Sequence, residues 1–248
     1  LNILRNTFNY KELHEVTKII TNNLNNVIDI NFYPTDKTYV SNNKHRPIGI
    51  GVQGLADAFA LLDIPFHSDS AKQINKNIFE TIYHAALESS MEISKEKGCY
   101  STFKGSPASQ GILQFDMWNV TPSDRYDWDS LKLNIKENGL RNSLLIAPMP
   151  TASTSQILGN NECFEPFTSN IYSRRTIAGQ FVCVNKFLLR ELIELNLWND
   201  NIKQNIVKFN GSIQQIDGIP KFLKDKYKTV WEIPMKHILE MSADRGAF

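Results

Sequence analysis

Pro47-Ile48-Gly49-Ile50-Gly51-Val52 is an apolar run of strand length, and a helical pattern over 55–62 follows it directly. A second apolar run, Ser143-Leu144-Leu145-Ile146-Ala147, stands much later in the chain, and a third β-like run covers 176–184. Short apolar runs between turn signals predict strands, and the first two are expected to be buried on both faces. Strands that alternate with longer helices favour an α/β fold over an all-β sandwich.

The first helix is predicted over 9–27. Asn9 and Glu12 form a capping-box pattern at its start. Apolar residues then recur at intervals of three and four, which predicts one buried face made by Leu13, Val16, Ile20, Leu24 and Val27.

The clearest helical pattern starts at Ser70, which with Gln73 resembles a capping box, and stops at Gly98. The sequence shows no internal repeat and no domain boundary. Further helices are predicted at 127–138, 187–197, 202–209, 220–227 and 235–241, whereas 33–46 and 98–122 are predicted to be irregular.

Composition excludes several classes of protein. The 248 residues are 42% hydrophobic and 21% charged, which is typical of a globular protein and not of a disordered or collagen-like one. Twenty-seven basic and 26 acidic residues leave a net charge of +1, so the basic footprint of a duplex-binding or membrane-adsorbing protein is missing. We expect no nucleic-acid partner and no membrane partner.

The three cysteines, Cys99, Cys163 and Cys183, form neither a disulfide framework nor a CxxC pair, which indicates a reducing compartment. No run reaches the length of a membrane span, and residues 1–5 lack a signal-peptide pattern. The chain is therefore predicted to be cytoplasmic. It starts without Met and ends without a helix stop, and we expect it to be a piece of a longer protein.

Gly49, Gly51 and Gly54 match the dinucleotide fingerprint G-x-G-x-x-G, between a predicted strand and a predicted helix. No acidic residue follows at the expected spacing, and two of the glycines lie inside the apolar run. Two interpretations stay open: a nucleotide-binding module or dehydrogenase, and close packing of a neighbouring backbone.

Thr151-Ala152-Ser153-Thr154 follows the second apolar run and opens a short helical pattern, with Thr151 or Ser153 at its cap. Free N–H groups in a first helical turn, the helix dipole and a row of hydroxyls together favour an anion such as phosphate. The alternative is that these hydroxyls cap the helix and meet water.

Residues 160–166 place amides, two carboxylates and Cys163 beside this turn. A reactive cysteine is one interpretation. Neighbouring carboxylates disfavour a thiolate, however, and no His or Lys adjoins Cys163, so loop closure is the other interpretation.

The five histidines show no metal-binding spacing, and the sequence predicts no metal site. Arg174 and Arg175 could meet a second anion or simply form surface charge.

Three segments together, 46–57, 141–154 and 159–162, resemble the large, catalytic subunit of class I ribonucleotide reductase, eukaryotic type. The likeness extends to 112–120 and 210–214. It implies a ten-stranded α/β barrel, of which 1–248 is expected to be a single segment from the later portion. The nucleotide-binding cone, the redox cysteine pair, the radical-cysteine loop and the C-terminal tail are expected to be absent.

The resemblance also implies a function. Members of this family reduce ribonucleoside diphosphates to 2′-deoxyribonucleoside diphosphates for DNA synthesis. The implied partners are the substrate, a second large subunit and a small subunit whose di-iron centre generates the radical, and the full enzyme responds to nucleotide effectors. Thr151, Ala152, Ser153 and Thr154 match the family's diphosphate-binding turn. The chain is expected to bind no cofactor, to supply no catalytic residue and to be inactive alone.

Asn161-x-Cys163-x-Glu165 reproduces the string around the family's radical cysteine. That loop belongs to a different segment in the family, so the role is not carried over to Cys163. Besides the reductase hypothesis, two others stay open at this point: the nucleotide-binding module that uses Gly49, Gly51 and Gly54, and a purely structural interaction domain.

Overall fold

The computed structural model describes residues 7–248. Contacts divide them into two compact units. Of the described residues, unit 1 contains 7–8, 52–74 and 150–242. Unit 2 contains 9–51, 75–149 and 243–248. No helix in the described part of the chain has the length and hydropathy needed to cross a membrane. The prediction about a signal peptide concerns 1–5, which lie outside the described residues.

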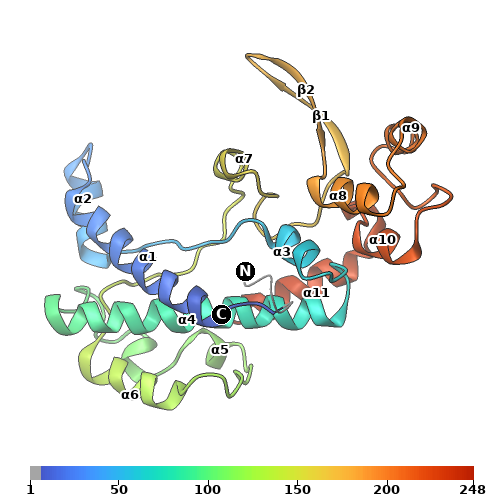
Figure 1. The fold of residues 1–248 in the computed structure, drawn as a ribbon. Coiled ribbons are helices and arrows are strands. Elements are labelled where there is room, and N and C mark those ends of the chain that lie inside the picture. The colour runs from blue at the N-terminus through green and yellow to red at the C-terminus, as the bar shows by residue number, and fades with distance from the viewer. Residues whose placement is uncertain (1–6) are drawn as a thin grey trace. The chain divides into compact units, whose positions relative to one another are not determined.

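Unit 2 is helical, and its largest element is α4, which begins in unit 1 (Figure 1). Gly98, with φ of +78°, ends α4 as predicted, and Asp127 and Gly139 bound α6 as predicted. The elements are α1 (Tyr10–Ile30), α2 (Asp36–His45), α4 (Asp69–Lys97), the 3-10 turn η2 (Ala108–Gln110), α5 (Gln114–Met117) and α6 (Trp128–Asn138).

Unit 1 combines short helices with one antiparallel hairpin, in which Ile171 pairs with Val184 and Thr176 with Gly179. A continuous apolar core includes Leu188, Ile206 and Tyr227, all fully buried. The elements are α3 (Leu55–Leu61), α7 (Thr154–Leu158), β1 (Ile171–Thr176), β2 (Gly179–Val184), α8 (Lys186–Glu194), α9 (Asp200–Lys208), α10 (Lys221–Lys226), the 3-10 turn η3 (Val230–Glu232) and α11 (Met235–Gly246), which continues into unit 2.

The two predicted apolar runs lie side by side in unit 2. They run parallel and meet in a single bridge between Ile50 and Ile146, where Ile50 N donates to Leu145 O at 2.8 Å. The prediction that both runs are buried on two faces is wrong. Ile50 is 5% exposed but Leu144 is 65% exposed, because successive side chains point to opposite faces and only one face is covered.

The predicted buried face of α1 is also wrong. Val16 and Val27 are exposed, whereas Thr17, Thr21 and Asn25 are buried. The threonine hydroxyls donate to the carbonyl one turn earlier in the same helix, and Asn25 binds a buried arginine. The threonine hydroxyls and Asn25 Oδ1 thus have partners and are buried at little cost, whereas Asn25 Nδ2 is buried without a partner among the described residues.

The predicted loop 33–46 contains α2 instead. Thr35 caps this helix, since its hydroxyl accepts from Thr38 N, and the Thr38 hydroxyl donates to Thr35 O at 2.7 Å. No residue of α2 is buried. Because α2 buries no face, its sequence has no periodic apolar residues from which the helix could be predicted.

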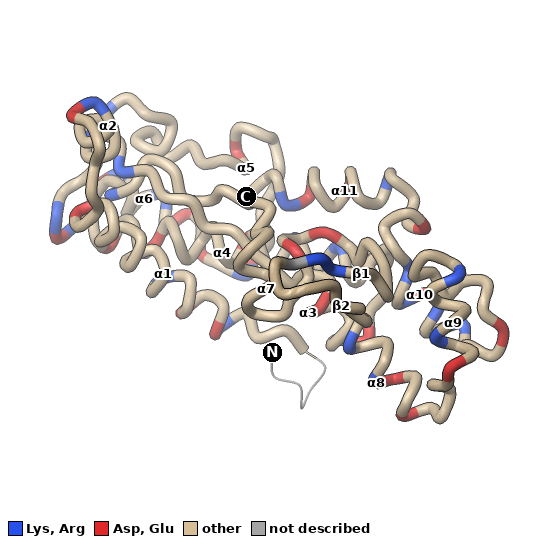
Figure 2. Tube along the Cα trace, turned by 90° about the horizontal axis from the view of Figure 1, so that it is seen from above, with Lys and Arg blue, Asp and Glu red and all other residues tan. Residues whose placement is uncertain are grey.

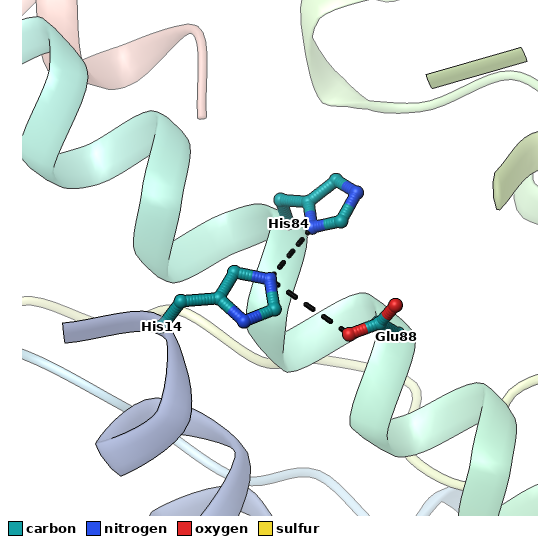
Figure 3. Close-up of side chains that lie close together, drawn as sticks. All are labelled: His14, His84 and Glu88. Carbon is teal, nitrogen blue, oxygen red and sulfur yellow. Dashed lines mark hydrogen bonds and ion pairs between the residues drawn. The ribbon is translucent and has the colours of Figure 1, made fainter. Parts of the chain in front are cut away.

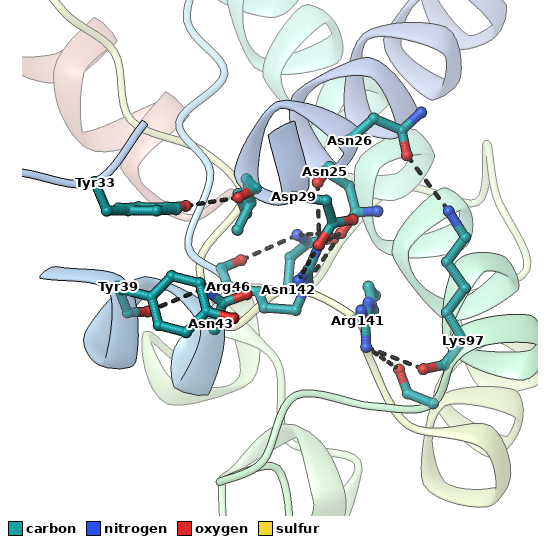
Figure 4. A network of polar contacts seen from close by, with 12 residues as sticks. Asn25, Asn26, Asp29, Tyr33, Tyr39, Asn43, Arg46, Lys97, Arg141 and Asn142 are labelled. Atoms are coloured by element: carbon teal, nitrogen blue, oxygen red, sulfur yellow. Dashed lines mark hydrogen bonds and ion pairs between the residues drawn. The ribbon is translucent and has the colours of Figure 1, made fainter. Parts of the chain in front are cut away.

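Arg46 ends α2 with a φ of 47° and is 3% exposed (Figure 4). Its guanidinium donates to Asn25 Oδ1 at 2.9 Å and to Asp29 Oδ1 at 2.8 Å. Its carbonyl oxygen accepts from Asn142 Nδ2 at 3.0 Å. This group of Asn25, Asp29, Arg46 and Asn142, the Arg46 cluster, joins α1 to the start of both parallel segments.

Candidate anion-binding turn

The turn 151–154 is held in place by its first residue. Thr151 is buried and has a φ of 54°, in the left-handed region. Its hydroxyl oxygen accepts from Cys163 N at 2.8 Å, and its carbonyl oxygen accepts from Ser155 N at 2.9 Å. These bonds at both ends hold the backbone in a conformation that a β-branched residue seldom adopts.

The rest of the turn is exposed and has open donors. Ala152, Ser153 and Thr154 are exposed, and no residue within 7–248 accepts a hydrogen bond from their backbone N–H groups. Ser153 is the N-cap residue of α7, as predicted, but its side chain makes no capping bond. Because α7 has only five residues, its dipole contributes little, and the turn's own donors define the site.

Asp57 supports the loop that follows α7, and sequence reasoning missed it. Asp57 Oδ2 accepts from Asn161 N at 2.6 Å, and Gly54 N donates to Asn161 O at 3.0 Å. Burial raises the pKa of Asp57 above its usual value, although the bond from Asn161 opposes that shift. The one feature of the sequence that could have indicated this role is an acidic residue in the first turn of the helix predicted after Gly54.

Cys163 has the contacts of a structural residue. It is 6% exposed, and its backbone N and O are bonded to Thr151 and to Leu55 N. Its φ is 37°, so it also lies in the left-handed region. Cys163 thus stabilises the turn through the bond from its backbone N–H to the Thr151 hydroxyl, and not through its thiol.

Two of the three fingerprint glycines have packing roles, and the third has a backbone role. A Cβ atom at Gly49 would lie 2.9 Å from Ala147 Cβ, and one at Gly51 would lie 3.2 Å from the backbone of Pro148. Gly54 has a φ of 76° and starts α3. Gly49 and Gly51 therefore allow the two parallel segments to approach closely, which favours the packing interpretation over a dinucleotide site.

Unit 1 also contains a pocket of about 620 Å³ beside α7. Its lining includes Asp57, Ser155, Arg174 and Lys186, but none of the turn residues 151–154. Arg175, the other half of the basic pair, is exposed. Basic residues appear in blue on β1 in Figure 2. Only one of the two predicted second-anion residues thus faces a cavity.

Two of the histidines belong to a group of possible metal ligands in unit 2. His14 and His84, whose spacing in sequence gave no metal pattern, lie beside Glu88. Two of these residues come from α4 and one from α1, 70 positions earlier than His84, so no local motif could reveal the group.

Comparison with known proteins shows the family of the chain. The family model described as "Ribonucleotide reductase, barrel domain" matches residues 1–248. The large chain of ribonucleoside-diphosphate reductase from Neurospora crassa is 61% identical over 242 residues, which cover 98% of this chain and 26% of that protein. The large subunit from Arabidopsis thaliana is 58% identical over 241 residues, covering 97% of this chain and 30% of that protein.

A third relative, large chain 2 from Saccharomyces cerevisiae, is 57% identical over 242 residues and is covered to 28%. The chain thus spans between a quarter and a third of the length of these relatives. High identity over nearly every residue, together with the family model, settles the relationship that the segments around Gly49 and Thr151 indicated. The chain belongs to the ribonucleotide reductase family, as part of its barrel domain.

Proposed function

We propose that this chain supplies the substrate-diphosphate-binding turn of a ribonucleoside-diphosphate reductase, which converts ribonucleoside diphosphates to 2′-deoxyribonucleoside diphosphates. One observation carries the proposal. The turn 151–154 presents unpaired N–H groups at Ala152, Ser153 and Thr154 on a backbone that is fixed from behind. Membership of the family supplies the substrate class.

The turn binds without any cationic side chain of its own. Backbone N–H groups and the hydroxyls of Ser153 and Thr154 donate to phosphate oxygens, and bonds to a charged acceptor are stronger than neutral ones. Thr151 contributes by fixing the turn, since its hydroxyl oxygen is already engaged by Cys163 N. The binding energy holds the ribose in one orientation for residues elsewhere in the enzyme, which is a positioning role.

The chemistry itself belongs to parts of the enzyme outside this chain. We assign no catalytic residue and no bound cofactor here, and the chain alone should not turn over. In the full enzyme, the partners would be a second large subunit and a small radical-generating subunit with a di-iron centre, while nucleotide effectors act on other regions. The location would be the cytoplasm.

The barrel assignment belongs to the same proposal. Residues 1–248 would form one segment, the later portion of a ten-stranded α/β barrel. The parallel segments around Ile50 and Ile146 would be two neighbouring strands of it. Their parallel direction and the helix that follows 47–52 support this, and strands from other segments would flank them.

The test uses the full-length protein with Ser153→Pro and Thr154→Asp combined. Proline removes one N–H donor and aspartate adds a negative charge, so the Kd for a nucleoside diphosphate should rise at least about tenfold. Thr121→Asp is the matched control, because it adds the same charge at an exposed loop position in unit 2. Equal substrate affinity in the double variant and the control would refute the assignment.

A further inference from the structure

Two histidines and one carboxylate face one another in unit 2. His14 lies on α1, and His84 and Glu88 lie one helical turn apart on α4 (Figure 3). His14 Nε2 is 2.9 Å from His84 Nδ1 and 3.8 Å from Glu88 Oε2. We propose that these three side chains form a binding site for a divalent transition-metal ion, and that Zn²⁺ is the ion that fits them best.

The donor set and the distances both fit zinc. Imidazole nitrogens and a carboxylate oxygen are ordinary zinc ligands, and three protein ligands leave a fourth position for water. Ligand atoms at about 2.0 to 2.2 Å from a tetrahedral zinc ion lie roughly 3.4 Å apart. The separations of 2.9 and 3.8 Å bracket that value, and all three ligand atoms lie within 4.8 Å of one another, so rotation of the side chains can bring them to zinc-binding spacing.

Aromatic packing holds the imidazole rings in position. The His84 ring stacks on Tyr126 with centroids 4.2 Å apart and meets the edge of Trp128 at 5.0 Å. The His14 ring also stacks on Tyr126, at 5.6 Å. Tyr126 is itself fixed, because its hydroxyl donates to Thr81 Oγ1 at 2.8 Å. Ligands whose orientation is set in advance lose little freedom when an ion binds.

Burial favours the neutral imidazoles that metal binding requires. Burial lowers the pKa of His84 to about 4, and burial also lowers the pKa of His14. Without an ion, one ring must donate its N–H to the other across the 2.9 Å contact. When an ion binds, the donating ring carries its proton on its other ring nitrogen, so each ring turns a lone pair to the ion.

The surrounding charge favours a cation. Glu15, Glu88 and Glu92 act on His14 together with one ammonium group, Lys18, which leaves a net charge of −2 from these four groups. Lys18 Nζ lies 3.0 Å from Glu88 Oε2 and competes for that carboxylate. It also lies 2.7 Å from Glu92 Oε1, so it keeps a partner when Glu88 turns to the ion. Asp127, which acts on His84, adds further negative charge.

The experiment measures Zn²⁺ binding to the full-length protein by titration calorimetry. His84→Phe keeps the stack on Tyr126 but removes the ligand, and Glu88→Gln keeps an acceptor for Lys18 but removes the charge. Loss of a residue that only orients a metal ligand costs about 10- to 100-fold in affinity, so loss of a ligand itself should weaken the binding of one Zn²⁺ equivalent at least tenfold. His237→Phe is the control, because no metal-ligating group of three within 7–248 includes His237.

The thermal midpoint of unfolding is a second measurement, and it tests the proposal through Glu88→Gln even if His84→Phe does not fold. Zn²⁺ should raise the thermal midpoint of the wild type and the His237→Phe control by linkage, and should raise that of Glu88→Gln by less. The proposal is overturned if Glu88→Gln binds as many Zn²⁺ equivalents as the wild type with the same Kd, or gains the same thermal shift.

Discussion

The Arg46 cluster and the turn 151–154 each centre on a non-glycine residue with positive φ, yet they use polar groups in opposite ways. Arg46 is 3% exposed and its guanidinium is bonded to Asn25 and Asp29. The turn is fixed at Thr151, and the backbone N–H groups of Ala152, Ser153 and Thr154 have no acceptor within 7–248.

This difference separates architecture from binding. A buried polar group with partners specifies how elements meet, and losing one partner is costly. An exposed donor without a partner adds nothing to folding and is available to a ligand. Substitutions at the two places should therefore move different measurements, stability for the first and affinity for the second.

Arg46→Met should have the largest effect on stability. It removes the guanidinium bonds to the side chain and carbonyl of buried Asn25 and the pair with partly exposed Asp29, which together should cost about 3 kcal/mol. Hydrogen exchange of the amides in α1 and α2, measured in the full-length protein, reports that loss. Arg175→Met on β1 removes the same charge from an exposed position and should stay within about 0.5 kcal/mol. Equal exchange in the two variants would contradict the architectural role of Arg46.

Thr151→Val tests the part of the turn that resembles the Arg46 cluster. Valine keeps the shape but leaves the Cys163 N–H buried without an acceptor, which should cost about 1 to 3 kcal/mol. Thr151→Ser keeps the hydroxyl and should lose less than half as much. Exchange of the Cys163 amide distinguishes the two variants, and identical protection in both would show that the hydroxyl does not hold the loop.

Gly49→Ala tests a contact that contains no polar side chain. The new Cβ would meet Ala147 Cβ at 2.9 Å, and overpacking of this size costs about 1 to 3 kcal/mol. Ala147→Gly in the same chain should restore most of the loss, which a double-mutant cycle on urea midpoints would measure. Additive effects of the two substitutions would mean that the segments do not press together at this point.

Ser153→Ala should have the smallest effect on stability, within about 0.5 kcal/mol, because its side chain makes no capping bond. Substrate KM should nevertheless rise, since one hydroxyl donor is lost. Thermal midpoint and KM measured on the same preparation give both numbers. A lower midpoint with unchanged KM would reverse the proposed contrast between the turn and the Arg46 cluster.

Local signals predicted helix ends well. Asn9 with Glu12, Asp127 with Gly139, and Gly98 act through neighbours within a few residues, and the structure confirms each of them. The start of α4 was less well placed, because the hydroxyl that accepts from Ala71 N belongs to Ser68 and not to Ser70. An error of this size is common where several small polar residues precede a helix.

Features that depend on distant partners were not predictable. Asn25 meets Arg46 from the end of α2, and His84 meets His14 from α1, 70 positions earlier. The position of Ser153 at the helix start could be predicted from residue types. The absence of a capping bond could not, because it depends on how Thr151 and Cys163 orient the turn. Family likeness, rather than pattern, supplied the substrate class.

The parallel contact between the segments around Arg46 and Asn142 has a consequence for synthesis on the ribosome. The two residues stand 96 positions apart, so the first segment emerges long before its partner exists. At about 5 to 20 residues per second, the wait is on the order of 5 to 20 seconds. During that time, Ile48 and Ile50, both buried in the finished fold, have no strand to pair with. The nascent chain thus presents an apolar, glycine-containing segment to chaperones before it can fold.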